Sequence, residues 1–155
     1  MMSTAEDRLA EALAVAPAPV GAKALIDPVV VADGVAYVSG QVAFVGAEGP
    51  LLGKVGAGVT VERAAEEAGK AVANGLYRLI EAVGSLDAVE RVLKLTVFVN
   101  AVDDLIEQPE VANGASRVLL EVLGDRGRHA RSAVGVASLP LGVPVEVELV
   151  VKVRS

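Results

Sequence analysis

The sequence contains no cysteine and a single histidine, His129. A disulfide framework, a cysteine-type zinc site and a cysteine nucleophile are therefore excluded, because each needs thiol side chains. A bound metal ion would have to be held by carboxylates almost alone, so we expect no metal site. For the same reason, disulfides give no indication of the cellular compartment.

Long hydrophobic runs are also missing, although the mean hydropathy of +0.53 is high. No apolar run approaches the 18 or more residues that a membrane-spanning helix requires. The first residues include Glu6, Asp7, Arg8 and Glu11, which form neither the basic nor the apolar part of a secretory signal. We therefore expect a cytoplasmic protein that does not enter the membrane.

Basic residues are outnumbered, with 14 Lys and Arg against 20 Asp and Glu, and the formal net charge is −6. This sign is wrong for a surface that neutralises phosphates, so nucleic acid is not an expected partner. Only four residues are aromatic, and Val, Leu, Ile and Ala supply most of the 53% hydrophobic fraction. Such a surplus in 155 residues predicts a homo-oligomer in which another copy covers part of the apolar surface.

The N-terminal part of the chain predicts a separate short helix. Ser3 or Thr4 can cap a helix that continues to Leu13, and Pro17 and Pro19 prevent it from continuing further. We interpret residues 1–19 as an N-terminal helical appendage. The remaining residues, 20–155, are interpreted as a single domain.

Residues 28–59 predict a hairpin and a loop. Two Val-rich runs, 28–32 and 35–39, are joined by Asp33-Gly34, a dipeptide that favours the type I′ turn of a β-hairpin. Residues 46–58 contain five glycines and Pro50 and show no periodicity, which predicts an irregular loop.

The rest of the chain alternates between helical and extended patterns. Thr60 can cap a long helix that Gly84 ends, and a second helix is predicted over 109–123. Extended runs occupy 89–100, 131–137 and 143–153. The resulting order ββαβαββ predicts an α+β fold with both helices packed on one face of the sheet.

Side-chain alternation assigns faces to two of these strands. Leu93, Leu95, Val97 and Val99 are predicted on one face of the first strand, with Lys94, Thr96 and Phe98 on the other. In the last strand the odd-numbered positions from 145 to 153 form one apolar stripe, but Val150 on the opposite face is apolar too. This mixed second face predicts a subunit contact or the wall of a cavity.

Two common catalytic motifs are absent. Lys54 follows Gly53 in the glycine-rich loop, but the spacing from Gly49 is too short for a phosphate-binding Walker loop, and Val55 replaces the required Ser or Thr. No Gly-x-Ser-x-Gly elbow exists, and His129 has no placed partner for a catalytic triad. We interpret His129 as a structural or surface histidine.

The chemistry is concentrated in residues 127–148. Arg131 opens a strand, and its guanidinium is suited to hold a carboxylate by two parallel hydrogen bonds. Glu146 lies on the next strand, and hairpin pairing could bring it to the same end of the sheet. Together the two side chains suffice for acid–base chemistry on a small acid. A structural ion pair between Arg131 and Glu146 at a subunit contact is an equally good interpretation of the spacing.

Several segments together resemble the YjgF family, whose best-known members are imine and enamine deaminases. These segments are Tyr37-Val-Ser-Gly-Gln41, the long helix around Asn74, Thr96-Val-Phe-Val99, and the stretch from Arg131 through Leu139-Pro140 to Glu146. The resemblance extends over residues 20–153. Val111-Ala-Asn-Gly-Ala-Ser116 and Gly127-Arg-His-Ala-Arg131 are similar to a less characterised branch of the family.

The resemblance implies a trimer of chorismate-mutase-like subunits with clefts between neighbouring chains. It also implies that Arg131 holds the substrate carboxylate, that Glu146 positions water or transfers a proton, and that Ser39 and Asn113 line the pocket. Imine hydrolysis needs an anchored substrate and an oriented water but no cofactor. The expected partners are therefore a small carboxylate or imino acid and further copies of the chain.

Two positions depart from the family pattern. Ile26 falls where a pocket tyrosine is common, and Ala133 falls where Cys or Thr is common. Both changes predict a more apolar pocket. Either the chain acts on a bulkier or less polar imine, or it keeps the anchor as a small-carboxylate binding site without rapid turnover. The ribonuclease activity in the family name fits poorly with an acidic chain that has few aromatics.

Overall fold

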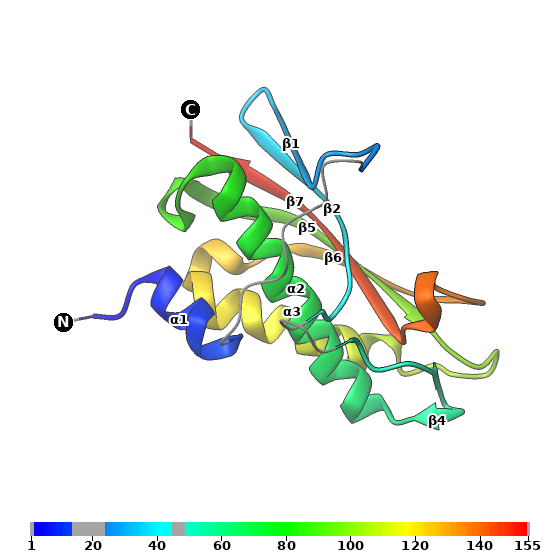
Figure 1. Ribbon diagram of the computed structural model, residues 1–155. Coiled ribbons are helices and arrows are strands. Elements are labelled where there is room, and N and C mark those ends of the chain that lie inside the picture. Colours follow the sequence, from blue (N-terminus) through cyan, green and yellow to red (C-terminus); the bar gives the residue numbers. More distant parts are fainter. Residues whose placement is uncertain (1, 14–23, 45–48, 155) are drawn as a thin grey trace.

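The computed structural model describes residues 2–13, 24–44 and 49–154. Pro17 and Pro19, which are predicted to stop the first helix, and the boundary between residues 19 and 20 lie outside the described residues. Figure 1 shows a sheet that carries its helices on one side. The elements are α1 (Ala5–Ala12), β1 (Val29–Ala32), β2 (Val35–Gln41), β3 (Lys54–Val55), β4 (Gly58–Val59), α2 (Val61–Val83), β5 (Val89–Asn100), α3 (Gln108–Leu123), β6 (Ala130–Val136) and β7 (Val145–Val153).

The main sheet has the strand order β1-β2-β7-β5-β6 and is mixed. β5 pairs antiparallel with β7 on one side and parallel with β6 on the other, while the remaining neighbours are antiparallel. The predicted α+β architecture with both long helices on one face is confirmed. Three 3-10 turns, Leu86–Ala88, Gly124–Gly127 and Pro140–Gly142, connect the larger elements.

The order of the last strands differs from the hairpin pairing that we expected between residue 131 and residue 146. β6 and β7 do not pair, because β5 lies between them. β6 follows α3 and returns to the sheet at the free edge of β5, where it can run parallel to β5 after the helical crossover. This arrangement removes the short route by which Arg131 and Glu146 were expected to meet.

The predicted hairpin is confirmed. Asp33 and Gly34 both have positive φ angles, 50° and 73°, as a type I′ turn requires. The predicted irregular loop contains two short strands, β3 and β4, which form a small separate sheet. β2 has a bulge between Val38 and Gln41, and this bulge shifts its register against β7.

A bulge also corrects the predicted face of Leu93. Leu95, Val97 and Val99 are fully buried against the helices, as predicted, but Leu93 is 40% exposed. The register of β5 against β7 shifts between Val92 and Lys94, so an extra residue interrupts the alternation. Val92 takes the buried position that Leu93 was expected to occupy.

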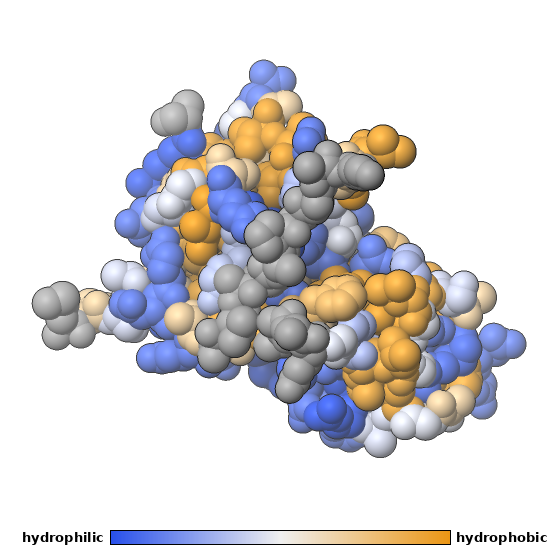
Figure 2. Space-filling model, viewed as in Figure 1, coloured by the Kyte–Doolittle hydropathy of each residue, from blue (hydrophilic) through white to orange (hydrophobic). Residues whose placement is uncertain are grey.

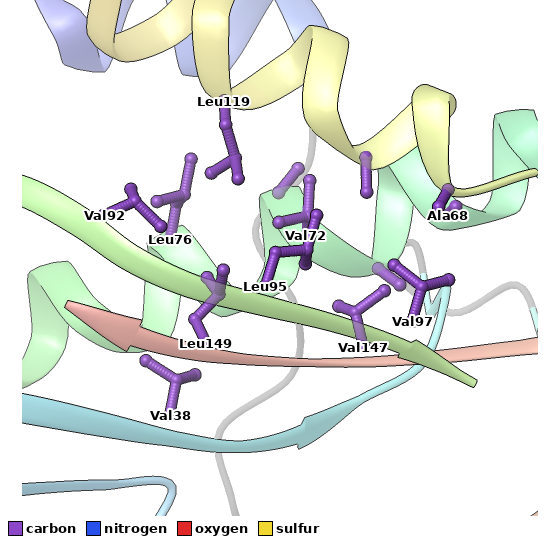
Figure 3. Packing of buried hydrophobic residues seen from close by; sticks show 14 of the residues in the cluster. Val38, Ala68, Val72, Leu76, Val92, Leu95, Val97, Leu119, Val147 and Leu149 are labelled. Atoms are coloured by element: carbon purple, nitrogen blue, oxygen red, sulfur yellow. The ribbon is translucent and has the colours of Figure 1, made fainter. Parts of the chain in front are cut away.

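The hydrophobic core lies between the sheet and the two long helices. Figure 3 shows side chains of β5 and β7 pointing toward those of α2 and α3, with Leu95 and Leu149 beneath Val72, Leu76 and Leu119. All of these side chains are buried. Thr60 caps α2 through its side chain, and Gly84 ends the helix with a φ of 88°. Both ends of the helix therefore lie where its cap residues predict them.

α1 packs on α3 and contributes to the same core. Ala5, Leu9 and Leu13 are buried in the main hydrophobic cluster. The Glu6 carboxylate accepts hydrogen bonds from the Ser85 hydroxyl at 2.7 Å and the Leu86 amide at 2.8 Å. Burial opposes ionisation of Glu6, but these hydrogen bonds prevail and lower its pKa. The division into residues 1–19 and 20–155 stays a prediction, although the described part of the helix is joined to the core.

Two glycines allow α2 and α3 to approach closely. A Cβ at Gly114 would overlap the backbone carbonyl of Ala65 on α2, whereas a Cβ at Gly69 would lie 3.3 Å from the Gly114 carbonyl. Backbone atoms at a helix crossing cannot move independently. Gly114 is therefore required for this helix spacing, while Gly69 tolerates a small shift.

We predict that Gly114→Ala destabilises the protein by about 1–3 kcal/mol, the usual cost of overpacking a core. Thermal unfolding monitored by circular dichroism should show a melting temperature lower by several degrees. Gly69→Ala is the matched control on the facing helix and should cost less. Equal melting temperatures for Gly114→Ala and the wild type would contradict the close approach.

Candidate functional site

Arg131 lies on β6, one of the two edge strands of the main sheet, and faces the helices. Its register partner on β5 is Leu95, which is buried in the core. The Arg131 Nη1 donates hydrogen bonds to Asn113 Oδ1 at 2.8 Å and to Ser116 Oγ at 3.1 Å, both on α3. Asn113 and Arg131, predicted from sequence as site residues, are thus brought together. Ala133, two residues further along β6, faces the same side and packs against the core.

His129 continues this group of polar side chains. Its Nε2 lies 3.0 Å from Ser116 Oγ, and its Nδ1 lies 2.6 Å from the carbonyl oxygen of Gly127. The interpretation of His129 as a structural histidine is compatible with these bonds, but the ring is connected to Arg131 through one hydroxyl. A hollow of about 240 Å³ opens here, lined by Ser116, Leu120, Arg128, His129 and Arg131.

Glu146 lies on the other face of the sheet. Its register partner on β5 is Phe98, whose neighbours Val97 and Val99 point into the core. The half-buried Glu146 side chain lies over Gly40 of β2, where a Cβ would overlap the carboxylate. Burial raises the pKa of the Glu146 carboxyl, and repulsion by Glu148 raises it further. A raised pKa makes this carboxyl a better proton acceptor than an ordinary glutamate.

Ser39 lies beside this second group and is connected to the segment that contains Ile26. Ser39 precedes Gly40 on β2, and its hydroxyl donates a hydrogen bond to the Asp27 carbonyl at 2.7 Å. That bond holds the segment before β1 against β2. Ile26, next to Asp27, is 68% exposed and contributes an apolar side chain to the surface.

The predicted site residues therefore form two groups on opposite faces of one sheet. We call the group of Arg131, Asn113, Ser116 and His129 the helix-side half-site, with Ala133 next to it. The group of Glu146, Gly40 and Ser39 is called the open-face half-site, and Ile26 is linked to it only through Asp27, its neighbour in the chain, whose carbonyl bonds to Ser39. Because a sheet separates them, Arg131 and Glu146 of one chain can neither act on one ligand nor form an ion pair with each other.

Lys54 is committed to a structural role. Its ammonium donates to Asn100 Oδ1 at 2.8 Å, to the Ala101 carbonyl at 3.3 Å and to the Ala137 carbonyl at 2.6 Å. Three donors with three acceptors leave no proton for a phosphate. Lys54 instead ties the glycine-rich loop to the ends of β5 and β6, in agreement with the absence of a Walker motif.

The other features that we considered as functional sites do not include the predicted site residues. A groove of about 740 Å³ between α2 and α3 is lined by several carboxylates but by none of the predicted site residues. Within residues 2–13, 24–44 and 49–154, no cluster of three or more His, Asp or Glu side chains could hold a metal ion. Of the described helices, none combines the length and hydrophobicity needed to cross a membrane.

Sequence reasoning missed the roles of Ser116 and Gly40. Ser116 falls three residues after Asn113 and so shares its face of α3, a spacing that could have indicated a common partner. Gly40 lies inside a β-rich run, where a glycine often marks close approach of another group. Nothing in the local sequence indicates that this group is Glu146, over a hundred residues away.

We predict that Gly40→Ala expels the Glu146 carboxylate toward solvent with little loss of stability, because only the end of a flexible side chain must move. The pKa of Glu146 should then fall toward its ordinary value, since burial is the main cause of its elevation. Carboxyl carbon NMR titration measures this change. Gly49→Ala, whose new Cβ would contact nothing, is the control. An unchanged Glu146 pKa in Gly40→Ala would refute the placement.

Comparisons with known proteins agree with this architecture. Protein TCP17 of Trypanosoma cruzi is 43% identical over 120 residues, which cover 77% of this chain and 75% of that protein. A crystal structure of the protein Atu1372 from Agrobacterium tumefaciens, described as of unknown function, superposes with a TM-score of 0.90 at 37% identity, covering 98% of this chain and 94% of that one.

A crystal structure from Shewanella oneidensis, described as a "putative endoribonuclease", also gives a TM-score of 0.90, at 28% identity over 97% of this chain and all of that one. Residues 6–153 match the family model described as "YjgF/chorismate mutase-like, putative endoribonuclease". This match extends over nearly the whole chain and includes both half-sites. The chain belongs to the YjgF/chorismate-mutase-like family.

Proposed function

We propose that the protein is a cytoplasmic enzyme that hydrolyses small 2-imino or enamino acids to 2-oxo acids and ammonia, without a cofactor, in clefts between the subunits of a homotrimer. The observation that carries this proposal is the separation of Arg131 and Glu146 onto opposite faces of the sheet. A carboxylate anchor and a proton acceptor are both present, but only two copies of the chain can bring them to one ligand.

The proposed reaction uses each group once. Arg131 holds the substrate carboxylate by two charge-assisted hydrogen bonds. Glu146 accepts a hydrogen bond or a proton from water, which adds to the carbon of the C=N bond. Glu146 returns the proton to the nitrogen of the tetrahedral adduct, and ammonia leaves as the C–N bond breaks and the carbonyl forms, so one water is consumed for each ammonia released. Ser39, Asn113, Ile26 and Ala133 form the pocket wall.

The open face of the sheet supports the proposed assembly. Its surface includes Val30, Tyr37 and Val134, each about half exposed, and the partly exposed Val150. Register places Val30 beside Tyr37 and Tyr37 beside Val150, which forms an apolar band across three strands. Figure 2 shows hydrophobic side chains also reaching the surface around β1, the free edge strand. Contact with other copies would remove this surface from water.

The endoribonuclease in the family description is not our proposal. A net charge of −6 and four aromatic residues disfavour phosphate neutralisation and base stacking. A non-catalytic protein that binds small carboxylates would use the same residues. Turnover measured on a panel of 2-imino acids, generated in place by an amino-acid oxidase, distinguishes that alternative from the enzyme.

Glu146→Gln should keep the fold and reduce imine hydrolysis by about 10² to 10⁴, the usual contribution of a positioned acid or base. Wild-type activity should fall on the acid side, as pH drops through the raised pKa of Glu146, because the proton-accepting carboxylate is then lost. The pH profile of kcat/KM checks both. Unchanged turnover in Glu146→Gln would remove Glu146 from the mechanism.

Arg131→Ala should weaken binding of pyruvate, a stable ketone analogue of the imine, by about 10-fold to 100-fold, and Arg131→Lys should lie in between. Calorimetric titration measures the affinities, with thermal melts alongside. An ion pair between Arg131 of one copy and Glu146 of another predicts the opposite pattern: equal pyruvate affinities but loss of stability or of assembly in Arg131→Ala.

Mixing the two impaired variants, assayed at a substrate concentration well below KM, tests the shared cleft directly. When Arg131→Ala and Glu146→Gln chains are unfolded and reassembled together, about a quarter of the clefts should combine an intact Arg131 with an intact Glu146. Activity in the mixture should therefore rise well above that of either variant alone, toward about a quarter of the wild-type value. Light scattering should give three times the 15.8 kDa mass of one chain. A monomer, or a mixture without this rise in activity, would defeat the shared cleft.

A further inference from the structure

We infer that Ser116 and His129 are positioning residues that orient the Arg131 guanidinium, so that a ligand carboxylate is received by Nε and Nη2. This inference rests on the proposed role of Arg131 as a carboxylate anchor. It concerns a chain of hydrogen bonds that runs from Arg131 through Ser116 and His129 to the Gly127 carbonyl.

The direction of each bond follows from its chemistry. The Gly127 carbonyl can only accept, so His129 Nδ1, at 2.6 Å, must carry the proton. In a neutral ring, Nε2 then has a lone pair and accepts the hydroxyl proton of Ser116 at 3.0 Å. With its proton directed to His129, the Ser116 oxygen presents a lone pair to Arg131 Nη1 at 3.1 Å. His129 therefore holds Ser116 as an acceptor for Arg131.

The second acceptor completes the orientation. Asn113 Oδ1 lies 2.8 Å from the same Nη1, which has two hydrogens, and the two acceptors on α3 use both. A guanidinium is planar, so fixing Nη1 fixes the whole group. Among the described residues, the edge formed by Nε and Nη2 has no hydrogen-bond partner, and it can bind a carboxylate with two parallel hydrogen bonds. The adjacent hollow of about 240 Å³, lined by both Arg131 and His129, provides the space.

A purely structural role would confine Ser116 and His129 to stabilising the turn before β6. The two roles predict different effects of a Ser116 substitution on the affinity for a carboxylate ligand. If this series of hydrogen bonds orients Arg131, removing the Ser116 hydroxyl should weaken carboxylate binding. It should raise KM more than it changes kcat, because Glu146 and its water are untouched. If the hydrogen bonds only support the turn before β6, removing the Ser116 hydroxyl should lower the stability of the fold and leave the affinity for pyruvate unchanged.

The binding experiment compares serine variants by pyruvate titration and steady-state kinetics. Ser116→Ala should weaken pyruvate binding by about 3-fold to 10-fold, as expected for one hydrogen bond. Ser116→Thr keeps the hydroxyl and should restore the affinity. Ser132→Ala is the matched control, because Ser132 lies next to Arg131 on β6 but accepts a hydrogen bond from Lys94 on the opposite face. Wild-type affinity in Ser116→Ala would overturn the inference.

The tautomer experiment uses nitrogen NMR, in which the single histidine of the chain needs no assignment. The ring should carry its proton on Nδ1, and pyruvate should shift the Nε2 resonance in the wild type but not in Ser116→Ala. A proton on Nε2, or a ligand-induced shift that survives in Ser116→Ala, would overturn the inference. Absence of pyruvate binding to the wild type would instead defeat the proposed function itself, and this inference with it.

Discussion

Side-chain alternation along β5 is the constraint on which the rest of the structure depends. Leu95, Val97 and Val99 must point toward α2 and α3, because their burial forms the centre of the core. Every residue paired with β5 on either side then takes a fixed face. Arg131, opposite Leu95, must face the helices, and Glu146, opposite Phe98, must face away from them. The alternation that packs the core therefore also places Arg131 and Glu146 on opposite faces of the sheet.

The same alternation leaves two unlike surfaces. The helix face of the sheet is closed by α2 and α3, whose close crossing depends on Gly114. The open face has no such cover within the described residues and combines an apolar band with Glu146 and Glu148. A half-buried carboxylate beside a second one is costly to ionise, and the raised pKa of Glu146 reflects that cost. A partner chain on this face would give both the apolar band and the carboxylate a role.

The polar groups of the helix-side half-site form one connected hydrogen-bond network. Nη1 of Arg131 has two acceptors on α3, and the ring of His129 uses both of its nitrogens. Such a connected network restricts rotation of the guanidinium, which in the proposed role of Arg131 would reduce the entropy lost when a carboxylate binds. Arg131 lies on an edge strand and lines a hollow, so that its remaining donors would be accessible to a ligand in the proposed role. The position of Arg131 on β6 therefore explains both the restricted rotation of its guanidinium and the accessibility of its remaining donors.

The sequence by itself determined the elements and their faces. Caps at Thr60 and Gly84, the Asp33-Gly34 turn and the apolar spacing of two helices are local signals, and local backbone chemistry is sufficient to decide them. The pattern of residues 127–148 also predicts Arg131 and Glu146 as the residues with useful chemistry, and this stays a prediction. Leu93 and the short strands β3 and β4 were exceptions, since a bulge and the pairing of short strands depend on the partner strand and not on the strand's own pattern.

Only the tertiary structure decided which residues meet. The insertion of β5 between β6 and β7, the position of Glu146 over Gly40, and the link from His129 through Ser116 to Arg131 all join segments that no local pattern relates. Alternation assigns a side chain to one of two faces, but it does not say which strand lies beside it. That choice depends on the simultaneous burial of all apolar faces, which is a property of the whole chain.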